Sequence, residues 1–360
     1  MREDWDIRLF KDVFDLQMGK TPDRKNFSLF EGDNTWVSIK DLDGKYISNS
    51  KECISDEAAN NIKLVKRGTV IMSFKLTIGK TAIAGKDLYT NEAIMAFNLR
   101  NGYDIDASFL YYYLKNYRWE GSNKAVMGIT LNKATISKHK IAIPPKPTQL
   151  SIVSELDKLN ELIRIKKEQL KDYDTLAQSI FYEMFGDPVE NEKGWEVKKF
   201  GDLFKLKSGD GLSSKDFKTG IYPVYGGNGI SGYHNSFNMK GCYIIIGRVG
   251  VYCGNVRKVE GEFWLTDNAF RLIYKENEQN PFFILYLLNI LDLHQYANAA
   301  AQPVISNLTL KSINVPLPPL SLQQSYAHKI EQIERQKAEV QKTITDLETL
   351  LAARMQYWFD

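Results

Sequence analysis

The residues best suited to chemistry near the start of the chain are two aspartates and a lysine. Asp23 follows a proline, and Asp43 and Lys45 enclose a glycine further on. Restriction-nuclease cores use two acidic residues and a lysine to hold a divalent metal and activate water. Asp43-Gly44 is also typical of a turn. A self-contained, metal-dependent DNA nuclease is therefore one alternative, and DNA cleavage by the pure chain would support it.

Other catalytic patterns are missing from the sequence. There is no GxxxxGK[ST] phosphate-binding loop and no Asn/Asp-Pro-Pro-aromatic tetrapeptide of the kind that amino-methyltransferases use. The histidines lack metal-ligand spacing, and the cysteines are few and widely separated. These residues are His139, His234, His294 and His328, and Cys53, Cys242 and Cys253. The sequence thus predicts no catalytic residue, no metal and no cofactor on this chain.

A glycine-rich stretch, residues 225–233, contains a literal GxGxxG at Gly227, Gly229 and Gly232. A dinucleotide site would require a helix that begins inside this motif, and the residues that follow do not resemble a helix. Two interpretations remain open. The stretch is either a tight structural turn, or a loop through which the backbone and Asn228 approach DNA, since asparagine suits the adenine edge in the major groove.

The elements that would position such loops are duplicated along the chain. Residues 5–20 align without gaps with residues 195–210, and six positions are identical. The identical pairs are Trp5/Trp195, Phe10/Phe200, Asp12/Asp202, Phe14/Phe204, Leu16/Leu206 and Gly19/Gly209. Residues 141–145 likewise resemble residues 315–319, and Gln149 and Gln323 follow at the same distance. The frame of one unit is therefore repeated, whereas the interiors of the two copies differ.

A long helix is predicted after each proline pair. Apolar residues recur there at an alternating four-three spacing, which forms a narrow seam typical of coiled coils. The seam residues are Ile152, Leu156, Leu159, Ile163 and Leu170 in the first helix and Ile330, Ile333, Val340, Ile344 and Leu347 in the second. Lys166 and Lys337 interrupt the seams, and such lysines usually extend into solvent. Each helix of roughly 35–39 residues would span about 52–58 Å, and we expect an antiparallel pair.

The blocks that precede these helices contain strand-like runs, each followed by a helix. In the first block, the runs are residues 35–39, 68–74 and 93–99, with a helix at 107–117. In the second, they are residues 222–225, 242–246 and 270–274, with a helix at 281–293. The predicted fold class is α+β, with two mixed α/β domains in tandem. They are separated by two long helices that form an antiparallel coiled coil with pseudo-two-fold symmetry. The predicted boundaries are 1–147, 148–187, 188–320 and 321–360.

Charge and hydropathy favour a nucleic-acid partner weakly and exclude a membrane span. The net charge is +3 in total, and the two domain blocks are mildly basic while the two helical segments are mildly acidic. Phosphate binding would favour that division, although ordinary surface charge explains it equally well. The chain has no apolar run of 18 residues, and residues 1–10 do not resemble a signal peptide. We therefore expect a cytoplasmic protein.

Over its whole length the chain resembles the specificity subunits of type I restriction-modification systems. The tandem arrangement of two target-recognition domains, each followed by a helical spacer, is the specific signal. Short phrases at residues 36–42, 181–187, 222–229 and 266–269 are also similar to the family. One departure is Gln323-Gln324, where the family often has Glu-Gln.

This resemblance implies a bacterial or archaeal protein that binds double-stranded DNA at a bipartite target. Two methylation subunits and the restriction subunits would be its partners, and they would carry S-adenosylmethionine, ATP and magnesium. The chain would direct adenine methylation and restriction without being an enzyme itself. A coiled-coil scaffold without DNA binding is a further alternative.

Nine residues are the candidate DNA contacts. Lysine, arginine, serine and threonine would meet phosphates, and asparagine, arginine or tyrosine could read base edges. The candidates are Lys20, Thr21, Lys40 and Lys75 in the first block and Lys207, Ser208, Tyr225, Asn228 and Arg248 in the second.

Overall fold

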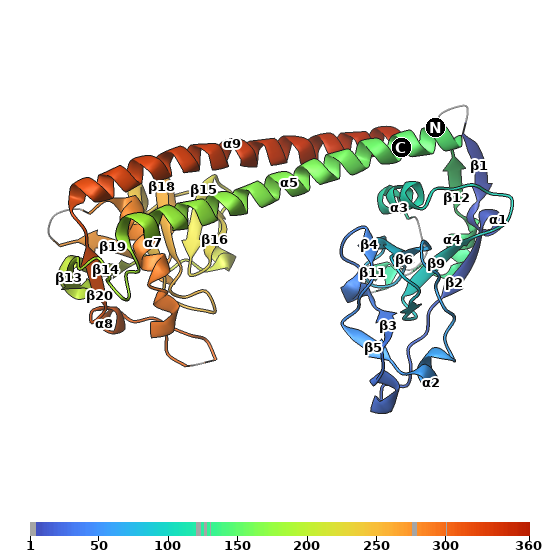
Figure 1. The fold of residues 1–360 in the computed structure, drawn as a ribbon, viewed down its shortest axis with the longest axis horizontal. Helices are drawn as coiled ribbons and strands as arrows, with labels where there is room; N and C mark the ends of the chain where they lie inside the picture. The colour runs from blue at the N-terminus through green and yellow to red at the C-terminus, as the bar shows by residue number, and fades with distance from the viewer. Residues whose placement is uncertain (1–4, 120–123, 126–127, 130, 276–278, 300) are drawn as a thin grey trace. The chain divides into compact units, whose positions relative to one another are not determined.

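The computed structural model describes residues 5–119, 124–125, 128–129, 131–275, 279–299 and 301–360 (Figure 1). The chain divides into two compact units. The first comprises residues 1–165 and 343–360, and the second comprises residues 166–342. Each unit therefore holds one α/β block together with part of both long helices. No helix in the described part of the chain is long and apolar enough to cross a membrane.

The first unit is built around a mixed five-stranded sheet in the order β2-β9-β6-β7-β4. A separate three-stranded sheet has the order β5-β3-β8, and β1 pairs with β12. The strands are β1 (Asp6–Leu9), β2 (Phe14–Met18), β3 (Asn34–Val37), β4 (Tyr46–Ile47), β5 (Glu52–Ile54), β6 (Val70–Ser73), β7 (Thr81–Ala84), β8 (Tyr89–Thr90), β9 (Ile94–Leu99), β10 (Lys124–Ala125), β11 (Gly128–Ile129) and β12 (Lys140–Ile143). The helices are α1 (Phe10–Val13), η1 (Phe27–Phe30), η2 (Ile39–Asp41), α2 (Asp56–Ala59), α3 (Ala107–Asn116) and α4 (Lys133–Lys138).

The second unit contains a six-stranded sheet in the order β14-β19-β17-β18-β15-β16, and β13 pairs with β20. The strands are β13 (Glu196–Lys199), β14 (Phe204–Ser208), β15 (Tyr222–Gly226), β16 (Gly229–His234), β17 (Met239–Gly247), β18 (Val256–Leu265), β19 (Ala269–Tyr274) and β20 (Asn314–Leu317). The helices are α6 (Phe200–Leu203), η3 (Ser214–Asp216), α7 (Pro281–Ile290), η4 (Leu293–Tyr296) and α8 (Asn307–Leu310). The α+β class and the predicted strands and helices of both blocks are confirmed.

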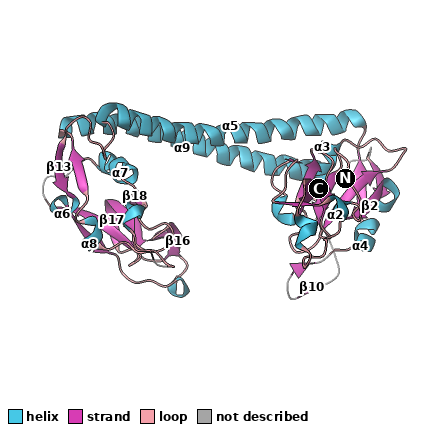
Figure 2. Ribbon diagram, turned by 60° about the horizontal axis from the view of Figure 1, so that its bottom comes forward, coloured by secondary structure: helices cyan, strands magenta, loops and turns pink. Residues whose placement is uncertain are grey.

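The two long helices are α5 (Lys146–Phe185) and α9 (Leu320–Phe359), which Figure 2 draws as continuous cyan ribbons. Helix α5 begins one residue before Pro147, so this proline lies in the first turn, where its missing N–H has no intrahelical partner to lose. Gly186 ends the helix with a φ of 74°, and its N–H donates to the carbonyl of Tyr182 at 2.8 Å.

Contacts inside each unit show that the two helices run antiparallel. In the first unit, Arg354 near the end of α9 forms an ion pair with Glu155 near the start of α5. In the second, Lys337 of α9 pairs with Asp174 of α5 at 2.7 Å. Lys337 is thus held by a carboxylate of the facing helix, where the sequence favoured extension into solvent.

Most of the seam residues are buried. Eight of the ten predicted positions are below a tenth exposed, and Leu170 and Leu347 are half-buried. The helix ends also join the domain cores. In the first unit, Ile152 and Leu156 of α5 pack in the same apolar cluster as Phe109 of α3. In the second, Phe181 of α5 and Tyr326 of α9 pack with Phe283 of α7.

The frame repeats in three dimensions as it does in the sequence. Helices α3 and α7 have the same length and lie 174 residues apart, as Ala107 and Pro281 show, and the same offset relates α5 to α9. The N–H of Phe10 donates to His139 in the first unit, as that of Phe200 donates to Ile313 in the second. Both phenylalanines are fully buried.

A buried glutamine ties each long helix to its domain. The Gln149 side chain is 1% exposed, accepts from the N–H of Asp106 at 2.8 Å, and donates to the carbonyls of Asp104 and Pro144. Gln323 makes the matching bonds to Asn280 and Pro318. Because a buried amide is stabilising only when its polar atoms are bonded, each glutamine fixes the entry of its helix.

We expect Gln149→Leu to lower the free energy of unfolding by about 2–4 kcal/mol, since it leaves buried backbone groups without partners. Urea unfolding followed by circular dichroism measures the change. Gln178→Leu, an exposed position on the same helix, is the matched control and should be close to neutral. Equal effects of the two substitutions would contradict this role for Gln149.

Candidate nucleic-acid interface

The divergent loops leave each frame at a glycine that lies against the backbone of another strand. A Cβ atom on Gly19 would lie 2.1 Å from the carbonyl oxygen of Thr90, and one on Gly209 would lie 2.1 Å from that of Leu265. The next residues donate to the same carbonyls, Lys20 at 2.9 Å and Asp210 at 3.0 Å. Only glycine fits these positions, and so the first residue of each loop has a fixed place.

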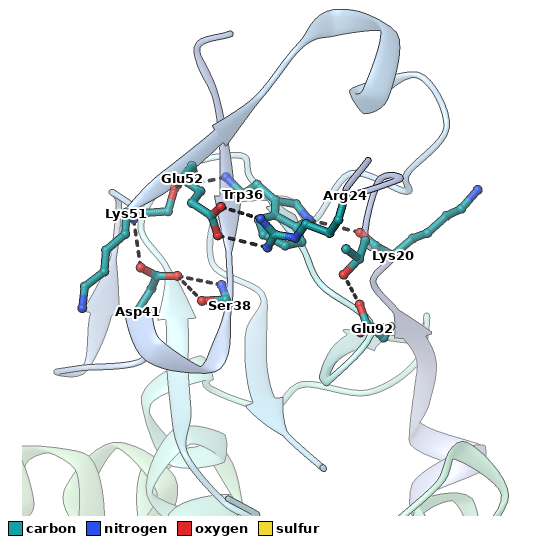
Figure 3. A network of polar contacts seen from close by, with 10 residues as sticks. Lys20, Arg24, Trp36, Ser38, Asp41, Lys51, Glu52 and Glu92 are labelled. Atoms are coloured by element: carbon teal, nitrogen blue, oxygen red, sulfur yellow. Dashed lines mark hydrogen bonds and ion pairs between the residues drawn. The ribbon is translucent and has the colours of Figure 1, made fainter. Parts of the chain in front are cut away.

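A tryptophan holds each loop from the other side, although the two units use different strands. The indole N–H of Trp36, on β3, donates to the carbonyl of Lys20 at 3.1 Å. That of Trp264, on β18, donates to the carbonyl of Asp210 at 3.2 Å. The backbone of Lys20 is therefore fixed while its ammonium group extends away from the network, as Figure 3 shows.

Arg24 lies at the centre of the network in Figure 3 and was not predicted from the sequence. Its guanidinium forms two bonds with Glu52, at 2.5 and 3.1 Å, and lies over the rings of Phe30 and Trp36. The hydrogen bond from Arg24 holds the pKa of Glu52 below its ordinary value. Trp36 and Glu52 lie well beyond Arg24 in the sequence, and no sequence pattern indicates that the fold brings these residues together.

The remaining candidates of the first unit differ in how exposed their side chains are and in whether these are already hydrogen-bonded. The Thr21 hydroxyl donates to the carboxylate of Glu92, so it is already engaged. Lys40 is exposed on η2, whose turn is held by Asp41 accepting from the N–H of Ser38 at 2.8 Å. Lys75 is half-buried, with its ammonium 5.5 Å from the centre of the Phe74 ring. Of the three candidate lysines in this unit, Lys20 and Lys40 are exposed and therefore more available to phosphate than Lys75.

In the second unit, the structure brings Ser208 and Arg248 together. Arg248 donates weakly to the Ser208 hydroxyl at 3.5 Å and to the carbonyl of Asp267 at 3.4 Å, and it lies over the ring of Phe270. Its Nε is buried, with no hydrogen-bond partner among the described residues. Lys207 is exposed on β14. Arg248 is thus positioned but incompletely bonded.

The glycine-rich stretch is a hairpin turn. Gly227 and Asn228 join β15 to β16, and no helix begins in the motif. The Tyr225 ring packs against Phe263, and burial raises the pKa of its hydroxyl. Asn228 is exposed, and its carbonyl accepts from Arg257 at 3.5 Å. The glycine-rich stretch is therefore a structural turn, and the same turn exposes the Asn228 side chain.

A hollow of about 470 Å³ lies beside this turn, and amide and hydroxyl side chains line it together with Leu212, Phe217, Ile230 and Val249. The polar side chains lining it belong to Ser213, Ser214, Asn228, Ser231, Thr266, Asn268 and Gln302. Ser213, Ser214 and Gln302 were not candidates from the sequence, because only the fold brings them near Asn228. Asparagine and glutamine amides can donate and accept toward one base edge, which makes this hollow suited to reading bases.

In the nuclease-like string, Lys45 is bonded to a carboxylate outside the string. Lys45 donates to both carboxylate oxygens of Asp157 on α5, at 2.6 and 2.8 Å. Tyr112 donates to the same carboxylate, and burial together with that bond raises the pKa of its hydroxyl. Across the described ranges, no group of three His, Cys, Asp or Glu side chains could hold a metal ion. Lys45 anchors the domain to the helix.

Two α+β units of one design, each packed on an antiparallel pair of long helices, define a tandem recognition-domain protein. The type I restriction modification DNA specificity domain matches residues 2–172 and again residues 192–349. The chain belongs to this family.

Relatives and solved structures agree with this assignment. The chain is 26% identical to the specificity subunit of the type I restriction enzyme EcoprrI from Escherichia coli, over 86% of this chain and 83% of that one. It is 28% identical to the MjaIX specificity subunit from Methanocaldococcus jannaschii, over 59% and 55% of the two chains. The S subunit from M. genitalium has the same fold, with a TM-score of 0.56 and 17% identity over 99% and 96% of the chains. A chain from a type I restriction-modification system gives a TM-score of 0.63, also at 17% identity, over 100% and 98%.

We expect Gly209→Ala to destabilise the second unit by about 2 kcal/mol or more, since a Cβ would overlap a strand carbonyl. Thermal unfolding is the measurement. Gly211→Ala is the control, because nothing lies within 4 Å of a Cβ there, and it should be neutral or slightly stabilising. A neutral Gly209→Ala would show that the strand moves to make room.

Proposed function

We propose that this chain binds double-stranded DNA at a bipartite sequence and directs adenine methylation, and restriction, by partner subunits. The observation that carries the proposal is the duplicated frame. Both units hold a loop at the same glycine and by a tryptophan, yet the loops differ in sequence and length. Two recognition domains of one design with different loops suit two different half-sites. Family membership supplies the class of complex.

The chain acts as a non-catalytic component of that complex. Its partners are two methylation subunits and, for cleavage, restriction subunits, which bind S-adenosylmethionine, ATP and magnesium. The complex works in the cytoplasm, where it meets DNA. The domain boundaries proposed from the sequence, 1–147, 148–187, 188–320 and 321–360, describe the recognition domains and the spacers between them.

We assign the contacts with phosphates and the contacts with bases to different residues. Lys20, Lys40 and Lys207 are exposed cations that would position the domains on the DNA backbone, with Thr21, Lys75 and Ser208 beside them. Asn228 would read a base from the hollow beside its turn, and Tyr225 and Arg248 are the other candidates for base edges in this unit. Base reading thus depends on amides and an arginine, while affinity and salt dependence depend on lysines.

The first test is a methylation map. The chain is expressed with the methyltransferase gene beside it in a host without DNA methylation, and the genome is sequenced with detection of modified bases. Methyl-adenine at one bipartite motif, absent when the chain is omitted, is the expected result. A soluble complex without chain-dependent methylation would favour the scaffold alternative.

Asn228→Ala should relax preference at one half-site and leave the other unchanged, with a loss of about 1–3 kcal/mol in discrimination at one base pair. The same methylation map reads out both halves. Lys207→Ala is the comparison, since a phosphate contact should weaken binding uniformly and reduce the salt dependence. Equal weakening of both half-sites by Asn228→Ala would contradict base reading.

The spacer helices should set the unread gap. Inserting seven residues into each helix keeps the seam in register and adds about 10 Å, close to three base pairs at about 3.4 Å each. The methylated motif should then gain a gap of that size. An unchanged gap would refute this role, and insertion into one helix alone should abolish methylation because the paired helices would then differ in length by about 10 Å.

A further inference from the structure

The two units differ at one edge of the central sheet. In the first unit, β7 is covered on both sides, by β6 and by the short parallel strand β4. The N–H groups of Ile83 and Gly85 donate to the carbonyls of Lys45 and Ile47, at 2.8 and 2.7 Å. The β4 segment therefore pairs with the second half of β7 on this side.

The start of β18 is the counterpart of β7. Both strands follow a turn closed by the same backbone bond, from Gly79 to Ser73 at 3.0 Å and from Gly254 to Gly247 at 2.8 Å. Strand β17 then covers one side of β18, as β6 covers β7. On the other side, β15 reaches only Trp264 and Leu265, at the far end of the strand.

The rest of this edge has no strand partner among the described residues. The N–H and C=O groups of Val256 face away from β17, since the side chain of Asn289 bonds to both, at 3.3 and 3.2 Å. Alternate residues of an antiparallel strand point their peptide groups the same way. The peptide groups of Lys258 and Glu260 therefore face the open edge as well.

The length of one connection explains the difference. Strands β3 and β5 are joined by residues 38–51, which contain β4, whereas β15 and β16 are joined by Gly227 and Asn228 alone. The second unit has no segment to place beside β18. An open edge of this kind is a template for strand addition from another chain.

A groove of about 1040 Å³ occupies the place that β4 fills in the first unit. It lies within the second unit, between β18, the β15–β16 hairpin, α7 and the long helices, whose ribbons Figure 1 shows close together. Tyr286 lines it from the position in α7 that Tyr112 has in α3. In the first unit, Tyr112 and Lys45 meet on the Asp157 carboxylate.

The charges of the groove are unbalanced on its helical wall. Asp174 and Glu334 share the single ammonium of Lys337, at 2.7 and 3.1 Å. On the opposite wall, Lys258 is paired with Glu260 at 3.0 Å, and Arg257 adds a further cation there, so the excess of carboxylates is confined to the helical wall. One further cation at the helical wall would balance these two carboxylates.

We infer that this groove binds an extended segment of a partner polypeptide as an added strand parallel to β18, with a lysine or arginine directed at Asp174 and Glu334. The backbone of Lys258 and Glu260 would supply the hydrogen bonds, and the helical wall would supply the preference for a basic residue. The site takes a protein segment, and it shares Tyr225 and Asn228 at its rim with the proposed DNA contacts, whereas Lys258, Glu260 and the helical wall belong to the groove alone.

The chain's own β4 segment provides the probe. A synthetic peptide of residues 41–50 is titrated to millimolar concentration into the full-length chain, and amide resonances are followed by NMR. We expect saturable shifts at Lys258 and Glu260, and binding at least about tenfold weaker for the peptide carrying Lys45→Glu. Before addition, the Lys258 amide should exchange with solvent faster than that of Ile83.

Two variants separate the groove from general effects of charge. Glu334→Gln should weaken the peptide severalfold, and Glu183→Gln, exposed on α5 outside the groove, should not. Unperturbed Lys258 and Glu260 amides, or equal binding of the Lys45→Glu peptide, would overturn the inference. Shifts at these amides caused by duplex DNA but not by the peptide would also overturn it, and would assign the groove to DNA.

Discussion

Each unit depends on the satisfaction of one buried amide at the point where its long helix begins. Gln149 and Gln323 lie at equivalent positions and are 1% exposed. Each bonds to the proline carbonyl just before its long helix and to the N–H of the residue that caps α3 or α7. An unbonded amide there would cost more than any single apolar contact contributes. The helix can therefore leave its domain in one direction only. The proline pair before each glutamine and the cap of α3 or α7 are fixed by the same bonds, so the frame behaves as one piece.

The duplicated frame could be predicted from the sequence because its determinants are local. Phenylalanines at Phe10 and Phe200 are buried in the same way, and Gly19 and Gly209 are required by the same close approach. The helices followed from a seam of period 3.5, and their antiparallel direction is visible in pairs such as Arg354 with Glu155. The interior could not be predicted, since β4 pairs with β7 across a long stretch of chain. Strand order of that kind leaves no periodic signal.

The candidate interface was predicted only in part, for a related reason. Exposed lysines such as Lys20 can be suggested by their neighbours in sequence, because their role needs no partner within the chain. Arg24 is different, since its position depends on Glu52 and on two rings supplied by the fold. Gln302 joins Asn228 at one hollow only through the packing of loops. Arg248 was a candidate, but its contact with Ser208 could not be foreseen.

A rigid frame allows the interiors of two copies to diverge without loss of the fold. The same carbonyl position is held by Trp36 from β3 in one unit and by Trp264 from β18 in the other. The start of the loop is thus held in the same way in both units, although the tryptophan that holds it comes from a different strand. The same freedom has a consequence at the sheet edge. Shortening the connection to Gly227 and Asn228 tightens the hairpin that presents Asn228, and it also removes the strand that would cover β18. A short connection that tightens one surface of a compact domain therefore leaves another edge open, and among the described residues that edge lacks the strand that β4 supplies in the first unit.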